Sequence, residues 1–265
     1  MRESFRKPYR VIKKKSIFKN RFFWLGILIL IILGGIFYLI YFYSFFQVKE
    51  IKIVGNQKVS GKEIDDLTQN QIWGKILLIQ TKSIFLVDFN KVKSGLLGKF
   101  PQINKVVFKR DFPDKVQIFV EERKPVAIFI SNEENFLIDK EGIVFEKVYN
   151  DMPEFLMVKN LTLQKDLNLG EKAVDIDVMS KILDIESKLE EKLRISLGSA
   201  SLAAEDKLDV KTKESWDIYF NPKGDIGWQI TKLSSVLEKE IPSEKRKDLE
   251  YIDLRFGNFA SYKFR

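Results

Sequence analysis

The residue types that carry most hydrolytic chemistry are missing from this chain or stand in unsuitable places. Its 265 residues include no histidine and no cysteine. Ser-His-Asp and Cys-His catalysis, and zinc sites that use histidine, are therefore excluded. The Ser-x-x-Lys motif of penicillin-binding enzymes occurs at Ser4 to Lys7 and Ser16 to Lys19, both inside a basic tail where no folded pocket is expected. The sequence therefore argues against a transpeptidase.

Two pairs of neighbouring carboxylates, Glu121-Glu122 and Glu133-Glu134, could in principle supply the acid and base of a glycosidase. Adjacency in sequence does not establish the separation that this chemistry needs, and in a chain with 31% charged residues such pairs are typical of a solvated face. No Gly-x-Gly-x-x-Gly or Gly-Lys-Ser/Thr loop is present for nucleotides. We therefore expect a protein that is not an enzyme and uses no metal ion, cofactor or small-molecule substrate.

The positive charge of the chain is concentrated in its first 21 residues. These carry nine basic side chains against the single acidic Glu3, a net charge of +8 that equals the net charge of the whole chain. Because this tail directly precedes an apolar run, the charge indicates membrane topology rather than binding of nucleic acid. The topogenic residues are expected to be Lys13, Lys14, Lys15, Lys19 and Arg21.

An uncharged stretch of 27 residues separates Arg21 from Lys49, and about 20 apolar residues are enough to cross a bilayer. The stretch ends in bulky aromatic residues rather than in a small-residue cleavage site, so Phe22 to Phe46 is expected to be an uncleaved signal anchor. A buried helix of a soluble protein is disfavoured because no face is polar. We expect residues 1–21 in the cytoplasm and residues 47–265 outside, a single-pass protein of the cytoplasmic membrane.

The first part of the ectodomain, residues 47–122, has the pattern of a compact α+β unit. The turn signal Gly55-Asn56 follows the first strand, and Ser60 with Glu63 has the spacing of a capping box. The expected elements are a strand at Gln47 to Val54, a helix after Ser60, a helix at Asn90 to Lys99, and a hairpin of Ile103 to Arg110 and Lys115 to Glu121.

The second part, residues 123–265, is expected to be a mixed, β-rich domain. The boundary is placed ahead of Pro125, since proline removes a hydrogen-bond donor from a sheet. Two amphipathic helices are expected, around Val178 to Leu189 and Leu233 to Leu237. The expected strands are Val126 to Ile130, Phe136 to Ile138, Ile143 to Phe145, a hairpin of Trp216 to Phe220 with Ile226 to Ile230, and the closing pair Tyr251 to Leu254 and Phe259 to Phe264.

Several strings, taken in order behind a signal anchor, resemble the bacterial cell-division family FtsQ/DivIB. The strings are Phe46 to Asn56, Phe112-Pro113-Asp114-Lys115-Val116 with Glu121, Arg123, Pro125 and Ala127, Leu137-Ile138-Asp139 with Gly142 and Phe145, and Tyr251 to Phe256. Ile226-Gly227-Trp228 departs from the Leu-Gly pair that the family tends to show there. The resemblance implies a POTRA domain of order β-α-α-β-β followed by a mixed β-rich domain.

The resemblance also implies a non-enzymatic scaffold of the division septum. Its partners would be other division proteins and two small bitopic coiled-coil proteins, FtsB and FtsL, besides membrane lipid. Matching Arg255-Phe256 to the terminal Asp-x-Arg-aromatic motif of the family carries partner contacts over to Phe256, Tyr262 and Phe264. Phe259 in the same segment and, more weakly, Lys213 ahead of Trp216 complete the predicted site.

The residues suggest how such a site could work. If Phe259 to Phe264 is the last strand of an open sheet, its outer row of N–H and C=O groups is an edge to which another strand can add. The alternative is that the aromatic residues are ordinary core residues of a terminal strand. A different class of function, a POTRA-bearing component of polypeptide transport, is less favoured because such components usually precede a β-barrel that this chain cannot supply.

Overall fold

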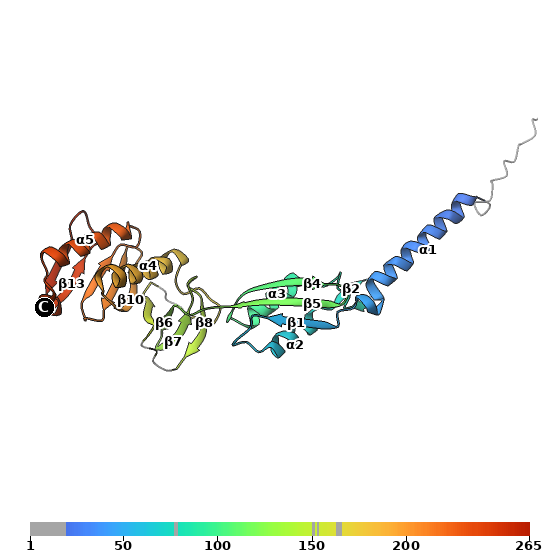
Figure 1. The fold of residues 1–265 in the computed structure, drawn as a ribbon, viewed down its shortest axis with the longest axis horizontal. Coiled ribbons are helices and arrows are strands. Elements are labelled where there is room, and N and C mark those ends of the chain that lie inside the picture. Colours follow the sequence, from blue (N-terminus) through green and yellow to red (C-terminus); the bar gives the residue numbers. More distant parts are fainter. Residues whose placement is uncertain (1–19, 77–78, 150–151, 153, 163–165) are drawn as a thin grey trace, which may run out of the picture. The chain divides into compact units, whose positions relative to one another are not determined.

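The computed structural model describes residues 20–76, 79–149, 152, 154–162 and 166–265 (Figure 1). By its internal contacts the chain divides into two compact units. The first comprises the described part of Met1–Lys52 with Gln69–Phe89 and Phe108–Ile118, and the second comprises Ile53–Thr68, Asn90–Val107 and Phe119–Arg265. The predicted boundary between residues 122 and 123 stays a prediction. The topogenic Lys13, Lys14, Lys15 and Lys19 lie outside the described residues.

The apolar stretch forms helix α1, Arg21–Phe42, whose N-cap Asn20 accepts a hydrogen bond from the N–H of Phe22 at 3.0 Å. At 1.5 Å per residue its 22 residues extend over about 33 Å, enough for the hydrocarbon core of a bilayer. None of its residues is buried, and its length and apolar composition make it a candidate membrane span. The 3₁₀ turn η2, Ser44–Phe46, follows, so the helix ends four residues before the predicted end of the span.

Three strands form the first sheet in the order β1-β5-β4, with β1 at Glu50–Val54, β4 at Ile103–Asp111 and β5 at Lys115–Glu122. Helices α2, Gly61–Gln71, and α3, Phe89–Lys99, precede the β4–β5 hairpin, which confirms the predicted order β-α-α-β-β. At the end of β1, Gly55 has a φ of +96°, and a β-carbon there would lie 2.2 Å from the carbonyl oxygen of Val120. Only glycine fits this turn.

A small hairpin between α2 and α3 escaped the sequence analysis. Its strands are β2, Gly74–Ile76, and β3, Ile79–Thr81, which pair with each other as a separate two-stranded sheet. Strands of three residues are too short to show the alternation by which strands are recognised in a sequence.

The second sheet has nine strands in the order β14-β13-β12-β11-β10-β9-β6-β7-β8. The pairs β6–β9, β9–β10 and β12–β13 are parallel, which makes the sheet mixed, as predicted. The strands are β6 Ala127–Ser131, β7 Glu134–Ile138, β8 Val144–Val148, β9 Leu156–Asn160, β10 Leu197–Ala204, β11 Lys207–Thr212, β12 Asp217–Phe220, β13 Leu249–Asp253 and β14 Ser261–Phe264.

Helices α4, Ile176–Leu193, and α5, Ile226–Lys239, cover one face of this sheet (Figure 1). The buried residues of both helices and of the sheet form one hydrophobic cluster around Trp216, which is inaccessible to solvent. A second cluster of Ile128, Leu137, Phe145 and Val148 packs among β6, β7 and β8. Packing against the core therefore holds the sheet in place, and the last strand of the sheet lies outside this core.

The predicted strand Ile226 to Ile230 is wrong, because these residues form the first turn of α5. Asp225 is the N-cap, and its carboxylate accepts a hydrogen bond from the N–H of Trp228 at 3.0 Å. The buried positions Ile226, Ile230 and Leu233 follow helical rather than alternating spacing. Strands β9, β10 and β11 were missed, and the predicted closing strand begins at Ser261 rather than at Phe259.

Candidate partner-binding edge

Strand β14 forms one edge of the nine-stranded sheet, and all four of its residues are exposed. It pairs antiparallel with β13, with Ser261 opposite Asp253 and Phe264 opposite Leu249. Just beyond the strand, the N–H of Arg265 donates to the carbonyl of Asp248 at 2.9 Å. Because backbone groups alternate sides along a strand, those of Tyr262 and Phe264 point away from the sheet.

The four predicted aromatic residues gather at this edge. Tyr262 and Phe264 lie on the same side of β14 with ring centroids 5.7 Å apart, and Phe256 and Phe259 lie in the loop that precedes the strand. All four side chains are between 37% and 69% exposed, so the alternative that they are core residues is wrong. Their grouping gives the edge a row of accessible rings. Their role in binding stays a prediction.

A buried lysine that the sequence analysis missed organises the loop before β14. Lys232 of α5 reaches the carbonyl oxygens of Leu254 at 2.6 Å, Gly257 at 3.2 Å, Phe256 at 3.4 Å and Phe259 at 3.5 Å. Burial lowers the pKa of this ammonium group. Its role could not be predicted, because its carbonyl acceptors lie more than 20 residues away in the sequence.

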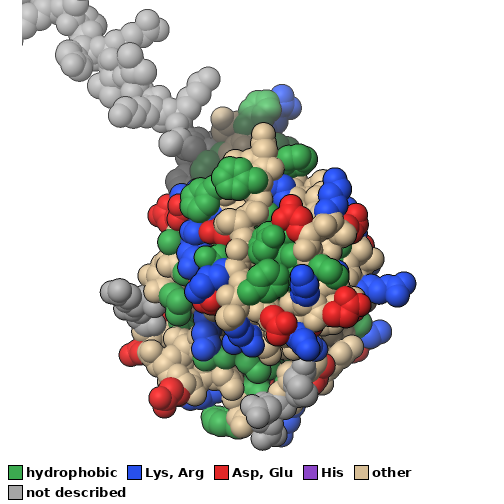
Figure 2. All heavy atoms as spheres, turned by 90° about the vertical axis from the view of Figure 1, so that its left-hand side faces the viewer, with side chains coloured by type: hydrophobic (Ala, Val, Ile, Leu, Met, Phe, Trp, Pro, Cys, Tyr) green, Lys and Arg blue, Asp and Glu red, His purple; other side chains and the backbone are tan. Residues whose placement is uncertain are grey.

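A groove of about 300 Å³ lies between α5 and the same loop. It is lined by Trp228, Val236, Phe259 and Ala260 together with polar residues of α5, and Trp228 is half exposed. In the adjoining strand β14, the hydroxyl of Tyr262 forms a hydrogen bond with the side chain of Glu240 at the end of α5. This hydrogen bond is the main cause of the raised pKa of Tyr262. Figure 2 shows this end of the molecule, where hydrophobic side chains lie between charged ones of both signs.

Arg255 is held beside Phe256 by a carboxylate of β13. Its Nε and Nη2 donate to the two oxygens of Asp253 at 3.0 and 2.7 Å, and its guanidinium lies 4.8 Å from the ring centre of Phe256. Burial opposes ionisation of Asp253, but the bonds and charge of Arg255 outweigh it and lower the pKa of the carboxyl group. The three named residues of the predicted Asp-x-Arg-aromatic motif therefore contact one another in the folded chain, through Arg255.

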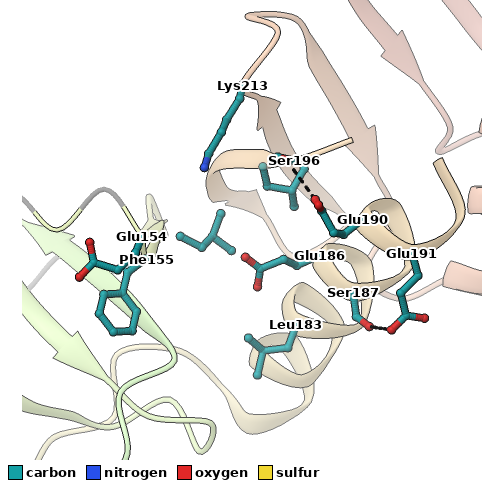
Figure 3. Close-up of a pocket in the computed structure, with 11 residues that line it drawn as sticks. Glu154, Phe155, Leu183, Glu186, Ser187, Glu190, Glu191, Ser196 and Lys213 are labelled. Atoms are coloured by element: carbon teal, nitrogen blue, oxygen red, sulfur yellow. Dashed lines mark hydrogen bonds between the residues drawn. The ribbon is translucent and has the colours of Figure 1, made fainter. Parts of the chain in front are cut away.

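Lys213 is placed apart from the aromatic residues, with its side chain in a different cavity of about 530 Å³ (Figure 3). The cavity lies between α4 and the neighbouring strand ends and contains Glu186, whose pKa is raised by burial and by the nearby Glu190. The side chain of Lys213 reaches toward Glu186 in this cavity. Of the topogenic residues only Arg21 is described, at the start of α1.

One carboxylate of each acidic pair considered for glycosidase chemistry has a structural partner. Glu122 accepts hydrogen bonds from the N–H groups of Gln57, Lys58 and Val59 at 2.8 to 3.0 Å. Burial opposes the ionisation of Glu122, but these bonds outweigh it and lower its pKa. Glu134 forms an ion pair with Lys147. Both carboxylates therefore have local structural roles.

Comparison with known families matches two parts of the chain after α1 separately. Residues 46–123 match the family described as POTRA domain, FtsQ-type. Residues 127–255 match the family described as Cell division protein FtsQ/DivIB, C-terminal. The second match includes the Asp253–Arg255 pair and ends ahead of β14.

The chain is also similar to curated relatives. It is 29% identical to cell division protein DivIB of Clostridium acetobutylicum over 102 residues, 38% of this chain and 37% of that protein. It is 33% identical to cell division protein FtsQ of Neisseria meningitidis over 111 residues, 41% of this chain and 42% of that protein. The matched part spans less than half the length of these relatives. Together the order of domains and both family matches show that this chain belongs to the FtsQ/DivIB family.

Proposed function

We propose that this protein is a non-enzymatic scaffold of bacterial cell division. In this proposal α1 anchors it in the cytoplasmic membrane at the division septum, the basic tail stays inside, and the POTRA domain contacts other division proteins. The β-rich domain recruits small bitopic coiled-coil partners similar to FtsB and FtsL by adding a strand of the partner to β14. The names of the relatives, which are cell division proteins, support the general role.

One observation carries the proposed mode of binding, the unprotected edge at β14. Its four residues are exposed, the backbone groups of Tyr262 and Phe264 point outward, and a groove lined by Trp228 and Phe259 lies beside it. In strand addition main-chain hydrogen bonds supply affinity, and pockets for alternate side chains supply specificity. This edge offers both.

Deletion of residues 261–265 from the full-length chain tests this mode of binding. We expect co-purification with the small bitopic partner from membranes to be lost, because the strand that templates the partner is gone. The deletion retains the four carbonyl acceptors of Lys232, so the preceding loop keeps its anchor. Glu146→Lys on the opposite edge strand is the control and should bind normally. Normal binding by the deletion would place the interface elsewhere.

The proposed topology has its own test. A reporter fused after Arg265 should be active only if it functions outside the cytoplasm, since Lys and Arg near the end of a span retain that side inside. Replacement of Lys13, Lys14, Lys15, Lys19 and Arg21 by Glu should reduce this activity. Activity of a cytoplasm-only reporter at the same position would reverse the proposed orientation.

A further inference from the structure

The carboxyl end of α1 is capped by side chains of the first compact unit. The last carbonyl groups of a helix have no partner within the helix. Here the hydroxyl of Ser83 donates to the carbonyl of Ile40 at 2.9 Å, and the hydroxyl of Thr81 donates to that of Tyr41 at 2.6 Å. Gln47 also donates to Tyr41, at 3.1 Å. Folded structure therefore begins directly at the end of the span.

Backbone hydrogen bonds extend this attachment beyond the helix. The N–H of Ile84 donates to the carbonyl of Phe46 at 2.9 Å, and the N–H of Val48 donates to that of Lys82 at 3.0 Å. The carbonyl of Asp114, in the β4–β5 turn, accepts from the N–H of Lys49 at 2.9 Å. Two segments distant in sequence, Thr81 to Ile84 and the turn at Asp114, are thus attached to the end of α1 and to the residues that directly follow it.

A row of phenylalanine rings starts at this attachment and continues away from the helix. The ring centroids of Phe45 and Phe46 are 5.1 Å apart, those of Phe46 and Phe85 are 5.4 Å apart, and those of Phe85 and Phe112 are 5.3 Å apart. Phe45, Phe85 and Phe112 are between 41% and 56% exposed. Exposed apolar rings in contact with one another form a patch that needs an apolar partner.

We propose that this row is a lipid-binding surface, by which the membrane-proximal end of the ectodomain rests in the interface of the outer leaflet. This inference rests on the proposed membrane anchor: the row begins within a few residues of α1 and is attached to its end, so continuity with the span identifies lipid as the occupant. Aromatic side chains favour the boundary between headgroups and acyl chains. Phe85 and Phe112 would extend the aromatic belt of the span from residues that are far from it in sequence.

The absence of natural cysteine allows single nitroxide labels to be placed on the otherwise unmodified full-length chain. Phe112→Cys is compared with Phe119→Cys. Phe119 is also exposed and lies on the same hairpin, roughly 13 Å along β5 from the first residue of that strand, Lys115. Ile31→Cys in α1 marks the hydrocarbon. The proteins are placed in phosphatidylcholine–phosphatidylglycerol vesicles at low density, and collisions with oxygen and with a water-soluble nickel chelate are measured.

We expect the ratio of oxygen to nickel collisions to be severalfold higher at position 112 than at position 119, and to approach the value at position 31. Equal ratios at 112 and 119 would overturn the lipid surface. Shielding of position 112 from both reagents would also overturn it, since the patch would then be covered by protein. Both label sites are exposed, so either variant should fold. The value at position 31 tests the span separately, so a failure of the anchor is distinguishable.

Discussion

The two edges of the nine-stranded sheet have the same backbone chemistry but different protection. At the β8 edge the chain covers its own strand, since the N–H of Val144 donates to the carbonyl of Glu171 at 3.1 Å and its carbonyl accepts from Gly170 at 2.7 Å. Val144 and Phe145 are buried, and Glu146 and Lys147 are held in ion pairs. At the β14 edge every residue of the strand is exposed.

This difference indicates which edge can accept a partner. A sheet edge is a hazard for unwanted pairing, and covering segments and charged side chains are common ways to block it. The β8 edge has both kinds of protection. The β14 edge also carries an ion-paired lysine, Lys263 with Glu250 at 2.6 Å, but it presents aromatic rings beside a groove, while buried Lys232 holds its loop in place. An edge that is left open but structurally supported is suited to a specific partner.

The largest expected effect comes from removing the support of the open edge. Lys232→Met should lower the free energy of unfolding by about 3 kcal/mol, because the buried carbonyl oxygen of Leu254 and partly buried carbonyl oxygens of the following loop lose their donor. Partner binding should fall with it, since Phe256 and Phe259 lose their fixed loop. Thermal unfolding and hydrogen exchange of residues 254–260 measure both effects. Lys192→Met, at an exposed position of α4 away from the groove, should be nearly neutral, and equal behaviour of the two variants would contradict the supporting role.

The second effect concerns the rings on the strand itself. Tyr262→Ala and Phe264→Ala should each weaken partner binding by about 2 kcal/mol, roughly 30-fold, if the rings fill pockets of the partner. The change in stability should be smaller, because both side chains are partly exposed. Binding and thermal unfolding are measured on each variant, with Tyr149→Ala beside β8 as the control. Losses of stability that match the losses of binding would mean that the rings support the fold of the edge and do not fill pockets of the partner.

A pair of proline substitutions separates backbone recognition from folding. The backbone N–H of Arg265 points toward β13, and the direction of the N–H groups alternates along the chain before it. The N–H of Ser261 therefore points toward β13, and that of Ala260 points outward. Ala260→Pro should weaken binding by about 1 kcal/mol with little loss of stability, because it removes one donor for an added strand. Ser261→Pro should destabilise the domain by breaking its own ladder. Titration calorimetry and thermal unfolding should show opposite patterns, and identical patterns would refute strand addition.

How far the sequence could predict these features depended on the length of each pattern. The run from Arg21 to Phe42 and the alternation of Val116, Ile118 and Val120 were long enough to give the span and the β4–β5 hairpin. Short strands such as β2 and β3 offered no periodicity. Lys232 was beyond prediction because its function depends on carbonyl groups more than 20 residues away, brought together only by folding.

The alternation of apolar residues at Ile226, Trp228 and Ile230 was misleading for a related reason. It fits a strand over five residues, and only the N-cap at Asp225 and the continuation to Leu233 distinguish the helix. The aromatic residues in and before the last strand were named from family resemblance, and their role in binding stays a prediction. The groove along α5 could not be predicted while the first turn of that helix was interpreted as a strand.

The smallest expected effect comes from changing Asp253, whose carboxylate on β13 supports the open edge. Asp253 lies opposite Ser261 in the ladder and holds Arg255 through two side-chain hydrogen bonds. Asp253→Asn removes the charge and one of these acceptors, so we expect a loss of about 1 kcal/mol in stability at neutral pH. The matched control is Asp217→Asn on β12, because burial raises the pKa of that carboxyl group instead of lowering it.

As the pH falls, the stability of wild type relative to the variant should change in opposite directions for Asp253→Asn and Asp217→Asn. Since the folded-state pKa of Asp253 is lowered, its contribution is fully present above the ordinary value of 3.8 and is lost as the pH falls through the folded-state pKa. Wild type and Asp253→Asn should therefore converge in stability below pH 3.8. Wild type should instead gain stability relative to Asp217→Asn as the pH falls toward 3.8, because protonation relieves a buried charge. Denaturant unfolding of residues 47–265 between neutral and acid pH measures both differences. A constant difference for Asp253→Asn at all pH values would mean that the loss comes from packing, and that Arg255 is not held at the edge by charge.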